Sequence, residues 1–265
     1  MEYVTLNNGV VMPILGYGTY QTPARLTERC VTNALEMGYR SIDTAQCYGN
    51  EREVRLACKR SCLPREDIFI TTKLWKCHTY EDALKSIDSS LCALNMEYID
   101  LLLIHEPTGH VYDIYRAMER SYKEGKIRAI GISNFLEKNY IDLINNCNII
   151  PAVNQVETHI FRQHINLRKL ECQIGTKHES WSPLACGRNG IFTNPTLQGI
   201  AKKYGKNIAQ IALRFLTQQG IIVIPKSLRG EHMQENLNSL NFLLEAEDMR
   251  LMETMDQGQS LFNWW

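Results

Sequence analysis

The sequence of 265 residues lacks any long apolar run, any excess of charge of one sign and any regular cysteine spacing. No stretch approaches the roughly 20 apolar residues that a membrane-spanning helix needs, and the first residues lack the basic and apolar segments of a signal peptide. The 29 basic residues equal the 29 acidic ones, which removes the electrostatic argument for binding nucleic acid or an acidic membrane surface. We therefore expect a cytoplasmic protein without an obligatory protein partner.

Nine cysteines are scattered along the chain without the spacing of a disulfide module or a metal site. We expect reduced thiols, as is usual in the cytoplasm, and no bound metal. Cys47 directly precedes Tyr48, but the sequence offers no evident cation to activate its thiol, which argues against a redox sensor. No Gly-x-Gly-x-x-Gly motif follows a strand, and 16–18 is too short to count as one, so a Rossmann-type nucleotide-binding fold is not predicted.

The order of apolar segments predicts eight strand–helix units. Asn7-Asn8-Gly9 lies between two apolar runs and predicts an N-terminal β-hairpin, which would close the bottom of a barrel. Periodicity predicts strands at 13–20, 40–43, 68–72, 99–104, 127–133, 152–156, 179–182 and 221–224, and helices at 26–37, 51–61, 80–94, 112–124, 136–146, 165–173, 195–204, 208–219, 232–240 and 246–255. The length suits a (β/α)8 TIM barrel of about 250 residues, with an extra C-terminal helix. No linker interrupts it, so we expect a single domain over 1–265.

Titratable residues stand at the ends of three successive predicted strands. Asp43 ends the second strand and leads through Tyr48 to Asn50, a candidate helix N-cap; Lys73 and His105 follow the third and fourth strands. Each has an ordinary structural explanation when taken alone. In a parallel barrel, however, the C-terminal ends of the strands meet on one face, where the chemistry is located. Their shared position therefore favours a common site.

Eight segments at predicted strand ends occur in the order typical of one family. They are Met12-Pro-Ile-Leu-Gly-Tyr-Gly-Thr, Ile42-Asp-Thr-Ala-Gln-Cys-Tyr-Gly-Asn-Glu51, Ile70-Thr-Thr-Lys-Leu-Trp75, Leu103-Ile-His, Lys126-Ile-Arg-Ala-Ile-Gly-Ile-Ser-Asn-Phe135, Pro151-Ala-Val-Asn-Gln-Val-Glu157, Trp181-Ser-Pro-Leu and Ile224-Pro-Lys-Ser227. With them the chain resembles the aldo-keto reductases along nearly its whole length, and its short loops are similar to the bacterial diketogluconate reductase-like branch. The resemblance implies metal-free, NAD(P)H-dependent reduction of aldehydes or ketones (small carbonyls, dicarbonyls or keto-sugars) to alcohols.

Carried over residue by residue, the resemblance places the catalytic tetrad on Asp43, Tyr48, Lys73 and His105. Tyr48 would donate a proton to the carbonyl oxygen as a general acid. A free tyrosine, with a pKa near 10, is a weak acid, so we expect the Lys73 ammonium to lower the pKa of Tyr48. Asp43 would hold Lys73 in place, and His105 would orient the carbonyl group.

Two other functions remain open from the sequence. The first is a Schiff-base lyase or aldolase on the same fold, with Lys73 as the nucleophile. The second is a non-catalytic sensor or binding subunit for a nicotinamide cofactor. A complete tetrad argues against the second, since a binding module has no need of an acid.

The resemblance implies a cofactor, NADP(H) and also NAD(H), lying across the mouth of the barrel. Its contacts would come from Gly18, Thr19, Tyr20 and Asp43 near the nicotinamide and pyrophosphate, Ser133, Asn134 and Gln155 at the carboxamide, Trp181 stacked on the nicotinamide, Ser182 and Leu184 at the phosphates, Lys226, Ser227, Arg229 and His232 around the 2′-phosphate, and Glu235 and Asn236 at the adenine.

One departure from the family pattern concerns the 2′-phosphate. The family usually carries Arg six residues after the lysine, where this chain has His232, and Arg229 is the nearest candidate to compensate. A neutral His lacks the permanent planar fork of Arg. We therefore expect a preference for NADPH that is weaker than usual.

A second departure concerns the substrate pocket. Many family members carry Trp-Pro after the catalytic His, where this chain has Glu106 and Pro107. The loops nearby are short, so we expect an open and partly polar pocket that takes a small carbonyl compound. Its expected lining is Tyr20, Tyr48, Trp75, His105 and Glu106, with the C-terminal Phe262 and Trp264 as further walls.

Overall fold

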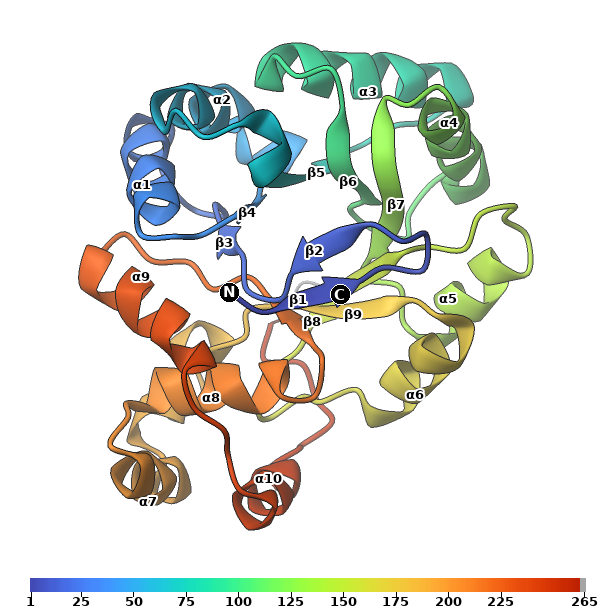
Figure 1. Cartoon of the computed structure of the whole chain (residues 1–265). Helices are drawn as coiled ribbons and strands as arrows, with labels where there is room; N and C mark the ends of the chain where they lie inside the picture. Colours follow the sequence, from blue (N-terminus) through green and yellow to red (C-terminus); the bar gives the residue numbers. More distant parts are fainter. Residues whose placement is uncertain (263–265) are drawn as a thin grey trace.

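The computed structural model describes residues 1–262 (Figure 1). Its strands are β1 (Tyr3–Thr5), β2 (Val11–Pro13), β3 (Tyr17–Gly18), β4 (Ser41–Asp43), β5 (Phe69–Leu74), β6 (Ile99–Ile104), β7 (Ile127–Ser133), β8 (Val153–Glu157), β9 (Lys177–Trp181) and β10 (Ile222–Val223). Its α-helices are α1 (Ala24–Glu36), α2 (Glu51–Arg60), α3 (Tyr80–Leu94), α4 (Val111–Lys123), α5 (Glu137–Ile144), α6 (Ile165–Ile174), α7 (Pro195–Tyr204), α8 (Ile208–Thr217), α9 (Gly230–Leu237) and α10 (Ala246–Glu253).

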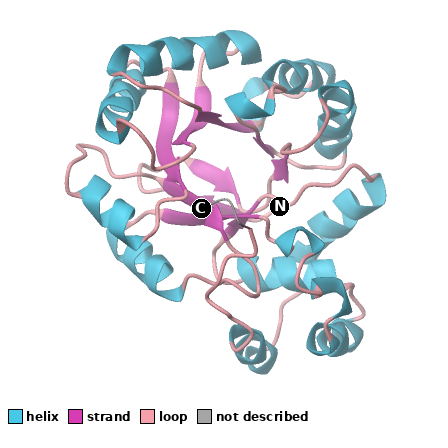
Figure 2. Ribbon diagram, turned by 180° about the vertical axis from the view of Figure 1, so that it is seen from behind, coloured by secondary structure: helices cyan, strands magenta, loops and turns pink. Residues whose placement is uncertain are grey.

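Strands β3 to β10 form one eight-stranded sheet in chain order, and every neighbouring pair is parallel. The sheet closes on itself at its two edges, where Leu15 bridges to Val223 and the Val223 amide donates to the carbonyl of Ile14 at 2.9 Å. Helices surround the strands in Figures 1 and 2. The predicted (β/α)8 barrel with an N-terminal hairpin and an extra C-terminal helix, α10, is confirmed. Among the described residues, none of the helices has the length and apolar character to span a membrane.

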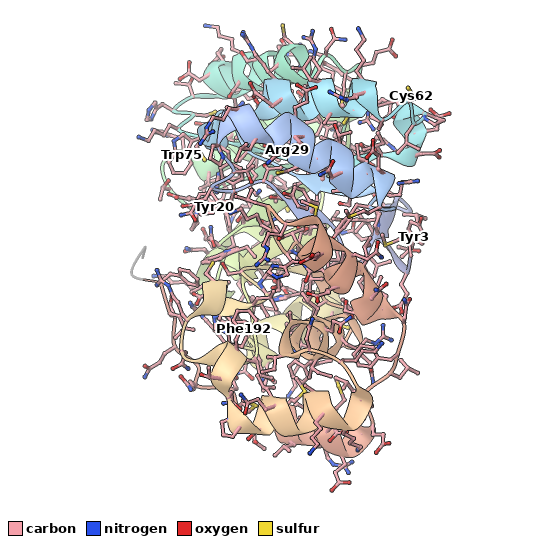
Figure 3. All side chains as sticks on the ribbon, turned by 90° about the vertical axis from the view of Figure 1, so that its left-hand side faces the viewer. Tyr3, Tyr20, Arg29, Cys62, Trp75 and Phe192 are labelled. Atoms are coloured by element: carbon pink, nitrogen blue, oxygen red, sulfur yellow. The ribbon has the colours of Figure 1, made fainter. Side chains whose placement is uncertain are left out.

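The apolar core has two parts, one between sheet and helices and one inside the barrel. The inner part joins Leu6 and Met12, from the hairpin region, to Leu101, Val153 and Ile222 of the strands. The hairpin β1–β2 therefore packs over the end of the barrel where the strands begin, as expected. Figure 3 shows Tyr3 of this hairpin on the opposite side of the molecule from Tyr20 and Trp75, so the end where the strands finish is left for the site.

Close packing inside the barrel explains one glycine of β7. A Cβ atom added at Gly131 would lie 2.6 Å from the carbonyl oxygen of Val153 and 2.7 Å from the side chain of Leu103. Both distances are shorter than real Cβ contacts, so a side chain would force the neighbouring strands apart. The strand pairing β6–β7–β8 thus depends on this glycine.

The expected boundaries of β9 are wrong by two residues at its start. We expected 179–182, but the strand runs from Lys177 to Trp181. Lys177 and His178, the two residues left out of the expected strand, are too polar to suggest a buried strand. They are accommodated because the polar side chains find partners: His178 Nδ1 lies 2.6 Å from Glu171 Oε2, and its Nε2 lies 2.8 Å from Thr158 Oγ1.

Candidate active site

Lys73 lies fully buried near the C-terminal end of β5 and brings three of the predicted catalytic residues together. Its ammonium nitrogen Nζ donates to Oδ1 of Asp43 at 2.6 Å, to the carbonyl oxygen of Thr44 at 2.9 Å and to the phenol oxygen of Tyr48 at 3.4 Å. Asp43 ends β4 and is 2 % exposed. Strands β4 and β5, with the loop after β4, thus place the Asp43 carboxylate, the Lys73 ammonium and the Tyr48 phenol in one hydrogen-bonded chain.

Tyr48 is held by the loop between β4 and α2. It ends a short 3₁₀ helix, Gln46–Tyr48, which is followed by a glycine in the left-handed conformation. Asn50 occupies the N-cap position of α2, but its side chain makes no capping bond. Instead it accepts from Thr44 Oγ1 at 2.7 Å and donates to the carbonyl oxygen of Thr19 at 3.2 Å. Asn50 therefore ties the loops after β3 and β4 together and fixes the approach of Tyr48.

The pKa of Tyr48 differs from the expectation. Burial raises the pKa of the Tyr48 phenol above 10, and the nearby Lys73 ammonium lowers it without cancelling the effect of burial. Lys73 lowers the pKa of Tyr48 as expected, but the net shift is upward because the loss of water around the phenol outweighs one cation. Tyr48 stays protonated at neutral pH, which is the form that an acid requires.

The pKa of Lys73 is raised. Burial alone would lower it, but the attraction of Asp43 and the interaction with Tyr48 more than offset that effect. Lys73 is therefore a permanent cation at neutral pH.

His105 follows β6, and its ring lies 5.8 Å from the Tyr48 ring and 5.1 Å from the Trp75 ring, centroid to centroid. Burial, followed by repulsion from Lys73, lowers the pKa of His105 to about 3, so the imidazole is neutral at pH 7. Its Nδ1 lies 3.4 Å from Sγ of Cys47. Burial raises the pKa of Cys47 to about 11 despite the proximity of Lys73, so Cys47 is a neutral thiol.

A cavity of about 710 Å³ opens over these residues at the ends of the strands. The predicted site residues that line it are Gly18, Tyr20, Asp43, Tyr48, Trp75, His105, Glu106, Ser133, Asn134, Gln155, Trp181, Ser182, Leu184 and Lys226. The sequence did not point to its other lining residues Gln21, Pro183, Cys186, Ile224 and Pro225, nor to the lining role of Cys47. Thr19 and Lys73 lie fully buried, and neither they nor Ser227, Arg229, His232, Glu235 and Asn236 line the cavity.

The residues expected to hold a nicotinamide ring are fixed by their own hydrogen bonds. The indole Nε1 of Trp181 donates to Oδ1 of Asn134 at 2.8 Å, and Nδ2 of Asn134 donates to the carbonyl oxygen of His105 at 3.1 Å. Ser133 Oγ donates to the carbonyl oxygen of Gln155. A half-buried aromatic ring held in this way beside a polar amide fits a flat heteroaromatic group with a carboxamide.

The loop after β9 carries an unusual run of left-handed backbone. Ser182, Ala185, Cys186 and Asn189 all have φ between 49° and 53°. Residues other than glycine adopt this conformation at some cost, and such strain gathers at ligand-binding loops. The segment expected to meet the cofactor phosphates is therefore shaped in a way that suits a ligand.

The residues expected at the adenosine end of the cofactor surround the start of α9. Ser227 Oγ accepts from the amide of Arg229 at 3.1 Å, which fixes this turn. The side chains of Lys226, Arg229 and His232 are exposed, and Arg229 lies 3.8 Å from Glu231. Asn236 is 4 % exposed, so it faces the protein interior more than an adenine contact would require.

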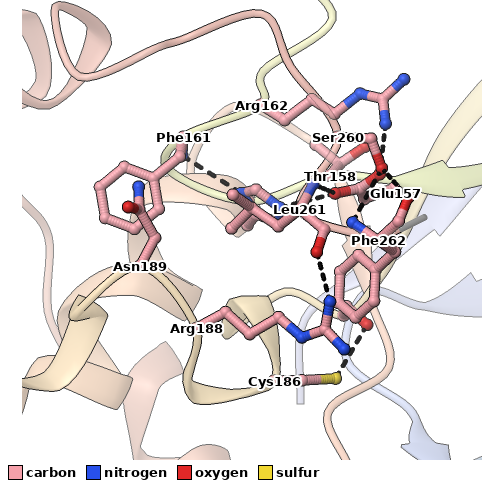
Figure 4. Close-up of polar contacts among 12 residues, drawn as sticks. Glu157, Thr158, Phe161, Arg162, Cys186, Arg188, Asn189, Ser260, Leu261 and Phe262 are labelled. Atoms are coloured by element: carbon pink, nitrogen blue, oxygen red, sulfur yellow. Dashed lines mark hydrogen bonds and ion pairs between the residues drawn. The ribbon is translucent and has the colours of Figure 1, made fainter.

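The C-terminal segment is held by polar contacts with Glu157 and Arg188 (Figure 4). Glu157, at the end of β8, accepts from Ser260 Oγ at 2.6 Å and from the Leu261 amide at 2.9 Å. The Phe262 ring lies 5.1 Å from the Trp181 ring, centroid to centroid. Phe262 is therefore near the cavity as expected, whereas Trp264 lies outside the described residues.

A second anchor of this segment comes from the loop after β9. The guanidinium of Arg188 donates to the carbonyl oxygen of Leu261 and lies 4.3 Å from the centroid of the Phe262 ring. All nine cysteines are free thiols. Within residues 1–262, no group of three or more His, Cys, Asp or Glu side chains is arranged to hold a metal ion.

The model of the Aldo/keto reductase family matches residues 14–257, and the chain belongs to this family. An aldo-keto reductase of Mycolicibacterium smegmatis is 40 % identical over 97 % of this chain and 94 % of its own length. A glyoxal reductase of Bacillus subtilis is also 40 % identical, over 97 % of this chain and 94 % of its own length. The crystal structure of an aldo-keto reductase from a Medee basin deep-sea metagenome library has a TM-score of 0.95 and 42 % identity, covering 98 % of this chain and 97 % of that one.

Proposed function

We propose that this protein is a cytoplasmic reductase of small aldehydes, ketones or dicarbonyls, using NADPH by preference and NADH as well. The observation that carries the proposal is the contact of Lys73 Nζ with both Asp43 and Tyr48 under an open cavity. The family generally uses nicotinamide cofactors, and one relative is named as a glyoxal reductase. Bound nicotinamide would supply the hydride that reduces the carbonyl carbon.

In this proposal Tyr48 provides the proton that the carbonyl oxygen needs as it gains negative charge. The phenol is protonated at neutral pH and is hydrogen-bonded to the Lys73 ammonium. As the proton leaves, the cation stabilises the phenolate that forms. Asp43 keeps Lys73 within reach, so its part is to position the ammonium.

His105 would orient the substrate as a neutral imidazole. If the Cys47 thiol donates its hydrogen bond to Nδ1 of His105, the imidazole carries its own proton on Nε2. In this tautomer Nε2 can donate to a carbonyl oxygen. Trp75 and Glu106 also line the cavity, which suits a small substrate with a polar part.

The rival lyase or aldolase mechanism is disfavoured by the surroundings of Lys73. A lysine that attacks a carbonyl must lose its proton, which usually requires a lowered pKa. The pKa of Lys73 is raised, its side chain is fully buried, and it does not line the cavity. A role as a cofactor sensor needs no proton donor, so the chain from Asp43 through Lys73 to Tyr48 favours catalysis.

The proposal is tested by assaying purified protein on small aldehydes, dicarbonyls and keto-sugars with NADPH and with NADH. We expect cofactor oxidation that depends on substrate for at least the dicarbonyls. Borohydride trapping with the same substrates distinguishes the rival. A covalent adduct on Lys73, with no cofactor oxidation on any substrate, would overturn the proposal in favour of the lyase.

A further inference from the structure

Glu179 is a fully buried carboxyl inside the barrel that the mechanism above does not use. It lies on β9, two residues before Trp181, and pairs in register with Gln155 of the neighbouring strand β8. Side chains two residues apart on a strand point to the same side, so Glu179 lies on the inward-facing side, below Trp181. A carboxyl in this position is costly to bury and calls for an explanation.

Gln155 links Glu179 to the catalytic ion pair. Its side-chain nitrogen Nε2 donates to Oδ2 of Asp43 at 2.9 Å and to Oε2 of Glu179 at 3.0 Å. The amide has two N–H hydrogens, so both are used by the two carboxyl groups. The remaining polar atom, Oε1 of Gln155, accepts no hydrogen bond from the described residues and belongs to a side chain that lines the cavity.

The hydrogen bonds of Glu179 fit a protonated carboxyl. Its Oε1 is buried and has no hydrogen-bond partner among the described residues. An oxygen without a partner costs far more on a buried carboxylate than on a neutral carboxyl, although the O–H of the neutral form then also lacks an acceptor. The buried hydroxyls of Ser41 and Thr71, on β4 and β5, also lack partners among the described residues and do not supply that donor.

We propose that Glu179 is a positioning residue of the reductase site. It holds the Gln155 amide so that Oε1 of Gln155 stays free for the cofactor carboxamide. It also carries a proton, so that no second negative charge lies beneath the Asp43–Lys73 pair. The inference rests on the function proposed above. It assigns a role to a residue that touches neither the cavity nor the reacting atoms.

The charges around Glu179 support this assignment. Burial, and then repulsion from Asp43, raises the pKa of Glu179 to about 8, while the Gln155 hydrogen bond and Lys73 lower it in part. The charged groups that act on it are Asp43 from β4 and Lys73 from β5. The flanking strands contribute the neutral Gln155 from β8 and the apolar Ile222, its register partner on β10. At pH 7 the group formed by Glu179, Asp43 and Lys73 therefore carries one negative charge, on Asp43, and one positive charge, on Lys73.

Ionisation of Glu179 would change the catalytic chain in a defined direction. A second negative charge, on Glu179, competes with Asp43 for the Lys73 ammonium. It also disfavours the negative charge that Tyr48 develops as it gives up its proton. Turnover in carbonyl reduction should therefore fall as pH rises from 7 to 9. A residue with a purely structural role would not produce this dependence.

Two substitutions separate the two parts of the role. Glu179→Gln keeps an acceptor for Gln155 and stays neutral at every pH, so cofactor affinity should remain within about threefold of wild type, and the fall in turnover between pH 7 and 9 should disappear. Glu179→Leu removes the acceptor, so cofactor affinity should drop about five- to tenfold, the scale of one hydrogen bond. Glu179→Leu leaves one N–H of Gln155 without an acceptor, which destabilises the fold, so Glu179→Gln, which keeps that acceptor, is the variant on which the test depends.

The decisive experiment is infrared difference spectroscopy of the cofactor-free protein between pH 6 and 9, which needs no catalytic activity. Wild type should show the C=O band of a protonated carboxyl that disappears as pH rises, and Glu179→Gln should lack it. The proposal is overturned if both proteins show the same band and the same pH–rate profile. Absence of reductase activity in wild type, with the band present, would instead count against the proposed function and leave the protonation of Glu179 established.

Discussion

The ammonium of Lys73 and the carboxylate of Asp43 form a buried ion pair, with Nζ 2.6 Å from Oδ1 and both side chains at most 2 % exposed. Burying two charges is costly, and a pair of this kind is retained in structures when it is hydrogen-bonded on all sides. Here the carbonyl of Thr44, the phenol of Tyr48 and the amide of Gln155 complete its bonding. The pair holds one cation beside Tyr48, the acid of the proposed reaction.

Lys73→Met and Asp43→Asn should affect activity in the same direction but to different extents. Lys73→Met removes the cation that stabilises the Tyr48 phenolate and leaves Asp43 buried and unpaired, so turnover should fall by about 10²-fold or more and stability by about 3 kcal/mol. Asp43→Asn loosens the ammonium without removing it and should cost less turnover.

Initial rates across pH and denaturant unfolding of both variants provide the measurement. Because Lys73 favours the phenolate, its loss should raise the pKa of Tyr48 further and change the alkaline side of the pH profile. If both variants keep the wild-type profile, Lys73 and Tyr48 are not coupled.

Cofactor choice should depend on the side chains expected at the 2′-phosphate, Lys226 and His232. The 2′-phosphate of NADPH carries close to two negative charges at neutral pH, and Lys226 supplies a permanent cation. His232 stands where the family usually carries an arginine, and its ring lacks the planar fork with which a guanidinium binds a phosphate, so the preference for NADPH over NADH should be weak in the wild-type protein. His232→Arg should raise the preference at pH 7.5, and Lys226→Ala should nearly abolish it, since a hydrogen bond to a charged group contributes roughly 1.5–3 kcal/mol.

Fluorescence quenching by each cofactor, with wild type and both variants, measures this preference. A ratio of affinities that His232→Arg leaves unchanged would show that the side chain at position 232 does not reach the phosphate.

Glu157 should stabilise the fold through the C-terminal segment, and the effect should vanish in acid. Burial alone would raise the pKa of Glu157, but hydrogen bonds from His159, Ser260 and the Leu261 amide, with the attraction of Arg162, lower it from 4.5 to about 2. A lowered pKa means that the stabilisation is present above about pH 4.5 and is lost as pH falls toward 2. Glu157→Gln should therefore reduce the free energy of unfolding at pH 7 by roughly 2–3 kcal/mol.

Urea unfolding of Glu157→Gln at pH 7 and at pH 3, beside Glu97→Gln as a control at an exposed loop residue, tests this linkage. The difference from wild type should shrink at pH 3 for Glu157→Gln, while the control should be neutral at both values. A difference independent of pH would mean that the lost stability comes from packing and not from the charge of Glu157.

The sequence was enough to predict the barrel and the convergence of Asp43, Tyr48 and Lys73, because each follows or ends a short apolar strand and the ends of parallel strands meet on one face. The stacking position of Trp181 came from the family resemblance, and the structure places this residue at the cavity. These predictions depend on local patterns of neighbouring residues, which a sequence displays directly.

Features that depend on distant contacts could not be predicted in the same way. The raised pKa of Tyr48 results from burial by segments far apart in the chain, which the sequence around Tyr48 does not reveal. Glu179 looked like part of a weak polar strand, because its partner Gln155 is brought opposite only by the register of β8 and β9. The burial of Asn236, which belongs to α9, likewise depends on how that helix packs.

The most direct test of the account is the Tyr48→Phe variant, assayed by initial rates of NADPH oxidation with a small dicarbonyl at saturation. The substitution keeps the ring and removes only the proton donor, so the account predicts a loss of turnover of about 10²-fold or more, with the dissociation constant for NADPH within a few-fold of wild type. Turnover within a few-fold of wild type, with the cofactor bound equally well, would show that another group delivers the proton and would contradict the assignment of Tyr48 as the acid.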